Sequence, residues 1–204
     1  MDDKVTYIKT EKDFKDAWTL LNNVFQIDQR MPNQVFKEPF GCFIFEEFDW
    51  AMSGEFWDLC LKSLGHIFHD SYILTTVLDP DPVNYFYHHF DYYNMVKLPI
   101  DISRSDYWNS LETGPKSSPA DAMLFNSEIV VWMPMSKKWA IWGERSYGIC
   151  ILAFADENIR AAATPLIKTW KSTNAALSDF VDINFHDKKA FQIFADTLIR
   201  NYAQ

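Results

Sequence analysis

The sequence predicts a single α+β domain over residues 1–204, with a mixed central β-sheet that ends in an antiparallel C-terminal meander and is flanked by helices. Three observations support this fold class. The 204 residues suit one domain. Strand-like and helix-like apolar patterns alternate along the chain, and three strand-like runs then follow one another closely over residues 128–154. With 48% hydrophobic and 17% aromatic residues, the chain can bury a core, which excludes disordered and collagen-like proteins.

The first elements alternate between strand and helix. Residues 4–9 alternate as a strand does, and Thr10 is placed to cap a helix, because its hydroxyl can accept a hydrogen bond from a free backbone N–H. The apolar positions of that helix recur at near-helical spacing: Phe14, Trp18, Leu21 and Phe25. Residues 40–48 form the next predicted strand.

A second helix is expected to start at Ser53 and to end near Gly65. Its apolar positions again follow the helical period: Phe56, Cys60, Leu64 and Ile67. A strand over residues 71–78 follows, and the prolines after it stop further strand pairing. Pro82 suits the first position of a short helix that Asp81 caps.

Residues 95–100 predict another strand, and residues 106–112 predict a further helical turn or two before a loop over residues 114–119. Residues 128–133, 138–142 and 147–154 are strand-like and are joined by short connections, which favour antiparallel neighbours. Because these runs are apolar at both alternating positions, helices should cover them on both faces.

Two helical segments complete the prediction. Residues 164–181 are expected to be helical in part, with uncertain bounds. A final helix starts near Asp187 and has one apolar face, made of Phe191, Phe194, Leu198, Ile199 and Tyr202.

The net charge of −9 lies entirely within residues 38–101. This segment holds eleven acidic residues against Lys62 and Lys97, whereas the remainder balances 17 acidic residues with 17 basic ones. It also holds fifteen of the 34 aromatic residues. Direct nucleic-acid binding is disfavoured, since such proteins present basic patches. A solvated acidic face that maintains solubility is the simpler interpretation, and a surface that meets a basic protein is the alternative.

Common catalytic motifs are missing. The six glycines form neither a dinucleotide fingerprint nor a Walker loop, and the chain has no Gly-x-Ser-x-Gly elbow and no Cys-x-x-Cys pair. We therefore expect no cofactor. The acidic start and the short apolar runs predict no signal peptide and no membrane-spanning segment. Three cysteines without close pairing suggest buried reduced thiols in a cytoplasmic protein: Cys42, Cys60 and Cys150.

Four histidines supply an enzyme-like alternative. On a helix, His66 and His69 would share a face, and a nearby carboxylate such as Asp70 or Asp91 could complete a metal site with His88 and His89. This constellation would make the chain a metal-dependent enzyme or a small-ligand binder. No familiar metal spacing is matched, and partly exposed, hydrogen-bonded histidines are the simpler expectation.

Residues 139–145 form the most distinctive string, Trp-Ala-Ile-Trp-Gly-Glu-Arg. On a strand its two tryptophans face opposite sides, so we expect one in the core and the other nearer the surface. Glu144 and Arg145 could form a recognition or catalytic pair, although a solvated hairpin rim is more common. Together with the acidic segment, this string gives the predicted partner-binding residues: Glu46, Glu47, Asp49, Asp79, Asp81, Asp91, Trp142, Glu144 and Arg145.

Four strings in order resemble one protein family: residues 118–121 (Ser-Pro-Ala-Asp), 129–132 (Ile-Val-Val-Trp), 139–145, and 149–152 (Ile-Cys-Ile-Leu). They are similar to the centre of uncharacterised bacterial immunity-type proteins, which are encoded beside polymorphic or contact-dependent toxins. The resemblance covers about residues 70 to 155. It implies a cytoplasmic, non-catalytic protein that binds a toxin domain, and it assigns no residue as a toxin contact.

The leading hypothesis is therefore an immunity protein that neutralises a basic, nuclease-like toxin domain through an acidic, aromatic surface. Complementary charge would speed association and favour the correct partner. The metal-dependent enzyme is the first alternative, and a structural subunit of a larger assembly is the second. The sequence does not specify the oligomeric state.

Overall fold

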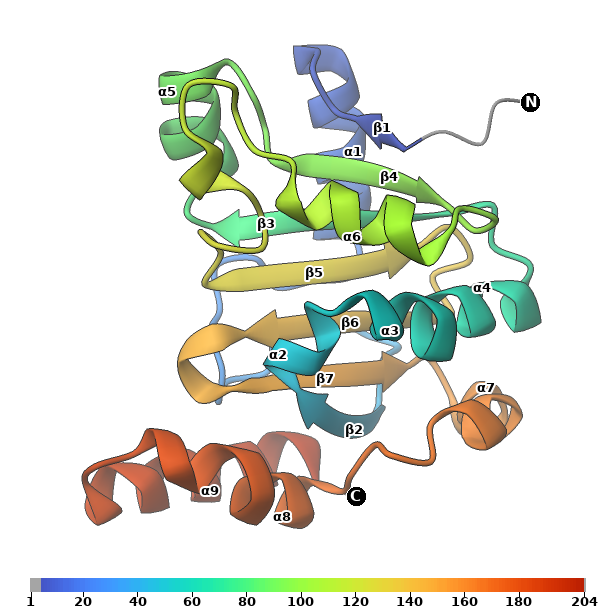
Figure 1. Ribbon diagram of the computed structural model, residues 1–204. Helices are drawn as coiled ribbons and strands as arrows, with labels where there is room; N and C mark the ends of the chain where they lie inside the picture. The colour runs from blue at the N-terminus through green and yellow to red at the C-terminus, as the bar shows by residue number, and fades with distance from the viewer. Residues whose placement is uncertain (1–4, 204) are drawn as a thin grey trace.

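A computed structural model describes residues 5–203. The chain forms one seven-stranded β-sheet with helices on both faces, in the order β1-β4-β3-β5-β6-β7-β2 (Figure 1). The strands are β1 Thr6–Tyr7, β2 Cys42–Glu47, β3 Tyr72–Asp79, β4 Met95–Pro99, β5 Ile129–Pro134, β6 Trp139–Glu144 and β7 Ile149–Phe154.

Every strand pairing in the described chain is antiparallel, which corrects the expectation of a mixed sheet. The strands that precede and follow the second predicted helix, β2 and β3, are not neighbours. Instead, β2 lies at one edge and pairs with β7, while β3 lies between β4 and β5. The single α+β domain, the helical flanks and the antiparallel meander β5-β6-β7 are confirmed.

One face of the sheet is covered mainly by helices from the middle of the chain, which lie toward the viewer in Figure 1. The core beneath them includes Trp57, Trp132 and Trp139, all fully buried. The helices that contribute residues to this core are α2 Phe48–Ala51, α3 Gly54–Phe56, the π-helical segment η1 Trp57–Leu61, α4 Lys62–Phe68, α6 Arg104–Glu112 and α7 Glu157–Ala163.

The opposite face is covered by the first helix, the loop over residues 23–41 and the C-terminal helices. Its core includes Phe25, Trp142 and Leu198, which are also fully buried. The elements of this face are α1 Glu11–Asn22, α8 Thr173–Ala176, η6 Leu177–Val181 and α9 Lys188–Tyr202. Figure 1 shows α8 and α9 beyond β2, at the opposite end of the sheet from β1.

The remaining helical turns connect these layers: η2 Pro82–Tyr87, α5 His88–Phe90, η3 Pro119–Asp121, η4 Arg145–Tyr147, η5 Thr164–Leu166 and η7 Asp182–Asn184. The capping predictions are confirmed. Thr10 accepts a hydrogen bond from the Asp13 N–H, and Asp81 accepts from the Val83 and Asn84 N–H groups. Asp187 caps α9 in the same way. These oxygens satisfy N–H groups that the first helical turn leaves without partners.

The meander is buried on both sides, as predicted. All residues of β5, β6 and β7 are buried, because the two helical layers enclose alternate side chains. Burying one large apolar side chain stabilises a fold by roughly 1.5–3 kcal/mol, so the buried side chains of these strands contribute strongly to the stability of the sheet.

The second predicted helix was expected to end near Gly65, but it continues to Phe68. Gly65 lies within α4, and its lack of a side chain lets Ile100 pack against the helix: a Cβ atom at this position would lie 2.2 Å from Ile100 Cδ1. The helix stops at His69, which adopts the left-handed conformation at φ 60°. Ile67, expected on the buried face, is 40% exposed.

Smaller differences complete the comparison. The first strand contains only Thr6 and Tyr7, and Lys4 lies outside the described residues. Helix α7 was not predicted. All three cysteines are buried and unpaired, and burial raises the pKa of the Cys60 thiol. In the described residues, no helix has the length and apolar character needed to cross a membrane.

Candidate functional site

A surface pocket of about 350 Å³ lies where the end of β2, the turn η4 and the segment η6-η7 meet. We call it the acidic pocket, because its lining combines three carboxylates with one guanidinium. It also includes two apolar side chains, and it brings together three of the nine predicted partner-binding residues. Its lining residues are Glu47, Asp49, Arg145, Gly148, Asp179, Phe180, Ile183 and Asn184.

Local hydrogen bonds hold the two walls of the acidic pocket together. The Asn184 side chain donates to the carbonyl oxygen of Tyr147 at 3.2 Å and to that of Phe180 at 2.9 Å. Gly148 has φ +69°, and a Cβ atom there would lie 2.8 Å from Asn184 Nδ2. Glycine is therefore required at this position both by its backbone conformation and by the close approach of Asn184.

The apolar wall is unusually exposed. Ile183 is 84% exposed, the highest value among the large apolar side chains of the described chain. It is flanked in sequence by Asp182 and Asn184, both exposed. Scattered exposed apolar residues are common, but one that lines a pocket beside charged groups is typical of a contact surface.

The carboxylates of the acidic pocket differ in how they are paired. The Asp49 side chain is 81% exposed and lies 4.0 Å from the Arg145 guanidinium. Asp179 pairs with Lys171, which lowers the pKa of its carboxyl group. Glu47 is exposed and makes no ion pair within residues 5–203. Glu47 and Asp49 therefore leave negative charge available at the surface.

Arg145 is mainly a structural clamp. Its Nε donates to the Ser127 carbonyl oxygen at 2.7 Å, and its Nη2 donates to the Leu124 carbonyl oxygen at 2.9 Å. Its guanidinium also lies 4.7 Å from the centre of the Phe48 ring. Only Nη1 faces a carboxylate, that of Asp49. The predicted Glu144–Arg145 pair is therefore divided between two environments.

Trp142, Glu144 and Glu46 are buried, so these three predicted residues do not form an exposed surface. Trp142 is fully buried, as is Trp139, and the expectation that one of the two lies nearer the surface is wrong, because both faces of β6 are covered and Phe25 of the loop over residues 23–41 packs on Trp142. Glu144 accepts hydrogen bonds from the Met31 N–H at 3.0 Å and the Trp142 indole at 3.3 Å. Burial raises its pKa to about 7.

The other predicted acids lie away from the acidic pocket. Asp79 is 3.7 Å from Arg30. Asp81 caps η2. Asp91 ends α5 in the left-handed conformation at φ 54°. The acidic segment therefore does not fold into one continuous face, and most of its aromatic residues are buried in the two cores.

The four histidines do not converge on a metal site. His66 lies 3.7 Å from Asp101, His69 ends α4, and His88 and His89 are exposed in α5. No group of three or more histidine, cysteine, aspartate or glutamate side chains in residues 5–203 is arranged to hold a metal. The structure gives the metal-dependent alternative no support.

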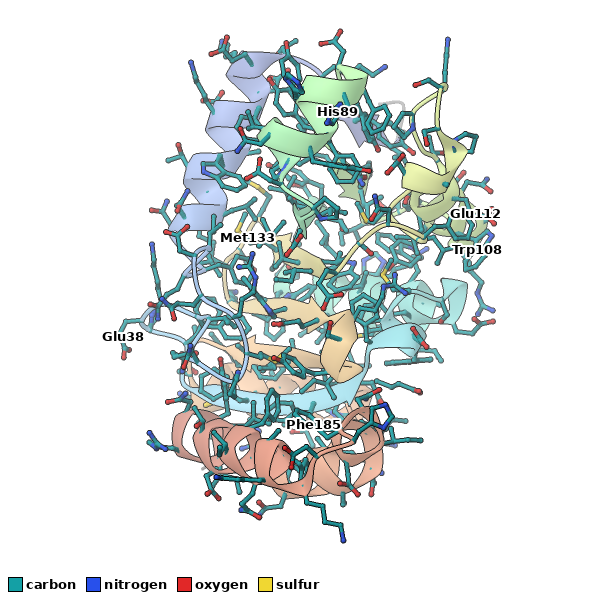
Figure 2. All side chains as sticks on the ribbon, turned by 90° about the vertical axis from the view of Figure 1, so that its left-hand side faces the viewer. Glu38, His89, Trp108, Glu112, Met133 and Phe185 are labelled. Carbon is teal, nitrogen blue, oxygen red and sulfur yellow. The ribbon has the colours of Figure 1, made fainter. Side chains whose placement is uncertain are left out.

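A hydrogen-bonded cluster does lie beside His89, whose ring is 5.5 Å from that of Tyr85. Asp121 accepts from the Tyr85 hydroxyl at 2.8 Å and from the Asn126 amide at 2.6 Å. Although burial opposes it, hydrogen bonds from Ser118, Asn126 and Tyr85 hold the Asp121 pKa below its ordinary value. We call Tyr85, His88, His89, Asp121 and Asn126 the histidine end. Figure 2 shows His89 and Phe185 at opposite ends of the molecule.

Sequence reasoning missed one wall of the acidic pocket, formed by Asp179, Phe180, Ile183 and Asn184. A single isoleucine between Asp182 and Asn184 gives no periodic signal, so its exposure depends on the packing of η7. Phe185 does pack inward, since its ring lies 5.9 Å from that of Tyr147 and 5.2 Å from that of Phe194. This aromatic contact fixes η7 beside η4.

Comparison with protein-family models, with curated proteins and with solved structures finds no match to this chain.

Proposed function

We propose that this chain is a non-enzymatic, cytoplasmic immunity-type protein that neutralises a basic, nuclease-like toxin domain, and that the acidic pocket contacts this partner. The observation that carries the proposal is the combination of an 84% exposed isoleucine with the available carboxylates of Glu47 and Asp49. Apolar contact supplies affinity at an interface, and complementary charge supplies association rate and specificity.

The chemistry of the acidic pocket favours a protein partner with basic side chains. A lysine or arginine of the partner could approach Glu47 and Asp49 while its aliphatic stem packs on Ile183 and Phe180. Nucleic acid itself is disfavoured, because three carboxylates against one guanidinium repel phosphate groups. Arg145 contributes mainly by holding the turn that shapes the pocket.

The direct test is binding to the basic toxin domain encoded by the neighbouring gene, measured by calorimetry at two salt concentrations. Ile183→Asp and Asp49→Lys should each raise Kd at least about tenfold, and Asp49→Lys should also reduce the salt dependence. Matched controls are Ile193→Asp, at a 61% exposed position on α9, and Glu38→Lys, on the exposed loop labelled in Figure 2.

Both controls lie outside the acidic pocket and should bind as the wild type does. The proposal fails if no complex forms with the wild-type chain. A complex that the two control substitutions weaken as strongly as the pocket substitutions would remove the acidic pocket from the interface.

A further inference from the structure

A second pocket lies at the β2 edge of the sheet and has a different chemistry. It has a volume of about 230 Å³ and is bounded by β2, α7, the start of α8 and the end of α9. We call it the edge pocket. Its lining residues are Phe43, Ile44, Arg160, Trp170, Ser172, Thr173, Asn174, Tyr202 and Ala203.

The lining of the edge pocket is rich in hydrogen-bond donors. The Arg160 side chain is 39% exposed and donates to Glu157 only through Nη1, so its Nε and Nη2 have no partner within residues 5–203. Trp170 is 8% exposed, and its buried indole N–H has no hydrogen-bond partner in the same range. Because Trp170 Nε1 is enclosed by the fold, Trp170 contributes a wall of the edge pocket rather than a donor.

The backbone of β2 adds a further donor and an acceptor. At Phe45 the outer edge of β2 exchanges two hydrogen bonds with Lys171, at 2.9 and 2.7 Å. Outward-facing positions alternate along an antiparallel strand, so the N–H and C=O of Phe43 also point to this edge. The chain after Lys171 turns into α8 at Thr173, and no described residue forms a backbone hydrogen bond with the outer edge at Phe43.

Aromatic side chains provide the apolar part of the wall. The Phe43 and Tyr202 rings meet edge to face, with their centroids 5.0 Å apart. Tyr202 is held in place because its hydroxyl accepts from the Val35 N–H at 2.9 Å, while its carbonyl oxygen accepts from the Thr173 hydroxyl at 3.2 Å. The edge pocket therefore has fixed walls and unpaired donors.

We infer that the edge pocket binds a carboxylate, with Arg160 as its charged partner and the Phe43 N–H as a further donor. A guanidinium recognises a carboxylate through charge-assisted hydrogen bonds. The carboxylate could belong to a free small acid or to the C-terminus of an extended peptide, whose backbone would pair with Phe43 as an added strand does. This inference is independent of the acidic pocket and of the basic partner proposed for it.

The test uses the full chain and four probes: acetyl-trialanine as the free acid, the same peptide as its carboxamide, sodium acetate and inorganic phosphate. Binding is followed by NMR through the indole N–H signal of Trp170 and by calorimetry. The free acid should bind at millimolar concentrations and shift the Trp170 signal, and the carboxamide should bind at least about tenfold more weakly. Acetate that binds as tightly as the peptide acid would identify a free small acid as the ligand.

Arg160→Gln should weaken acid binding at least about tenfold, whereas Trp170→Phe keeps the aromatic wall and should leave acid binding nearly unchanged. The matched control is Arg200→Gln, which removes an exposed guanidinium of α9 outside the edge pocket. Urea unfolding of each variant checks that it folds. The inference is overturned if the acid does not bind, if acid and carboxamide bind equally, if phosphate binds more tightly than either acid, or if Arg160→Gln behaves as Arg200→Gln does.

Discussion

The acidic pocket and the histidine end use similar side chains in different ways. At the histidine end, Asp121 is 8% exposed and accepts hydrogen bonds from neighbouring side chains, among them Tyr85 and Asn126. At the acidic pocket, Glu47 and Asp49 are exposed and lie beside Ile183, which has no apolar cover. The comparison shows that acidic and aromatic content does not by itself make a binding surface. A carboxylate engaged within the fold stabilises it, whereas one beside an exposed apolar group is available to a partner.

Glu144 is a further carboxyl group that the fold encloses. It is the last residue of β6, the strand that supplies Trp142, and it immediately precedes Arg145, yet it faces the core beneath the loop over residues 23–41. The charged groups that affect its pKa from neighbouring elements are Arg30, which lowers it, and Glu128, which raises it. Glu144 and Arg145 are therefore adjacent in sequence, yet the carboxyl group of Glu144 is buried and the guanidinium of Arg145 reaches the surface.

The largest expected effect is on the pH dependence of stability. Burial raises the pKa of Glu144 from 4.5 to about 7, so between these values the folded chain binds more protons than the unfolded chain. The stability that the protonated group supports is complete below pH 4.5 and is lost as pH rises through 7. In the wild type, the free energy of unfolding should therefore fall by about 3 kcal/mol between pH 4.5 and pH 8. Glu144→Gln should remove this pH dependence.

Urea unfolding across this pH range measures the effect. Glu38→Gln is the control, because Glu38 is exposed and is not among the groups that shift the pKa of Glu144. If Glu144→Gln and the wild type have parallel pH profiles, Glu144 does not titrate in this range.

Arg145→Met tests whether Arg145 stabilises the fold through its buried hydrogen bonds or belongs to a solvated hairpin rim. The substitution keeps the apolar stem and leaves the Leu124 and Ser127 carbonyl oxygens without their donor, so it should destabilise the fold by about 2 kcal/mol. Arg104→Met is the matched comparison, because Arg104 makes only exposed ion pairs. This substitution should lower the free energy of unfolding by less than about 1 kcal/mol. Equal losses in urea unfolding would assign Arg145 to the rim.

Tyr85→Phe tests the internal use of Asp121 at the histidine end. Losing the hydroxyl donor should lower the urea midpoint of unfolding only slightly, since Asn126 still donates to the same carboxylate oxygen. Tyr72→Phe removes a hydroxyl that has no hydrogen bond in the described chain and should be nearly neutral. A Tyr85→Phe variant as stable as Tyr72→Phe would show that Asp121 does not depend on this contact.

The smallest expected effect concerns metal. Because structural zinc needs about four ligands and no suitable group lies in residues 5–203, equimolar Zn²⁺ should leave the melting temperature unchanged. The double variant His88→Ala/His89→Ala should respond in the same way. A zinc-dependent rise in Tm that the double variant loses would restore the metal-dependent alternative.

The sequence by itself determined the local features of the fold. Thr10 and Asp81 cap helices, as predicted, because a side-chain oxygen can satisfy a free N–H a few residues away. Residues 128–154 form a doubly covered meander because their apolar run has no polar face to turn to water. These results depend on contacts between neighbours in sequence and on short-range patterns of polarity.

Only the tertiary structure decided which charges and apolar groups reach the surface. Local patterns could not place β2 beside β7, and this pairing, with the C-terminal helices beyond it, forms both pockets. Nor could they show that Glu144 is buried while Glu47 is exposed, or that Ile183 lies outside the core. Exposure depends on elements distant in sequence, because a side chain is buried only when another part of the chain covers it.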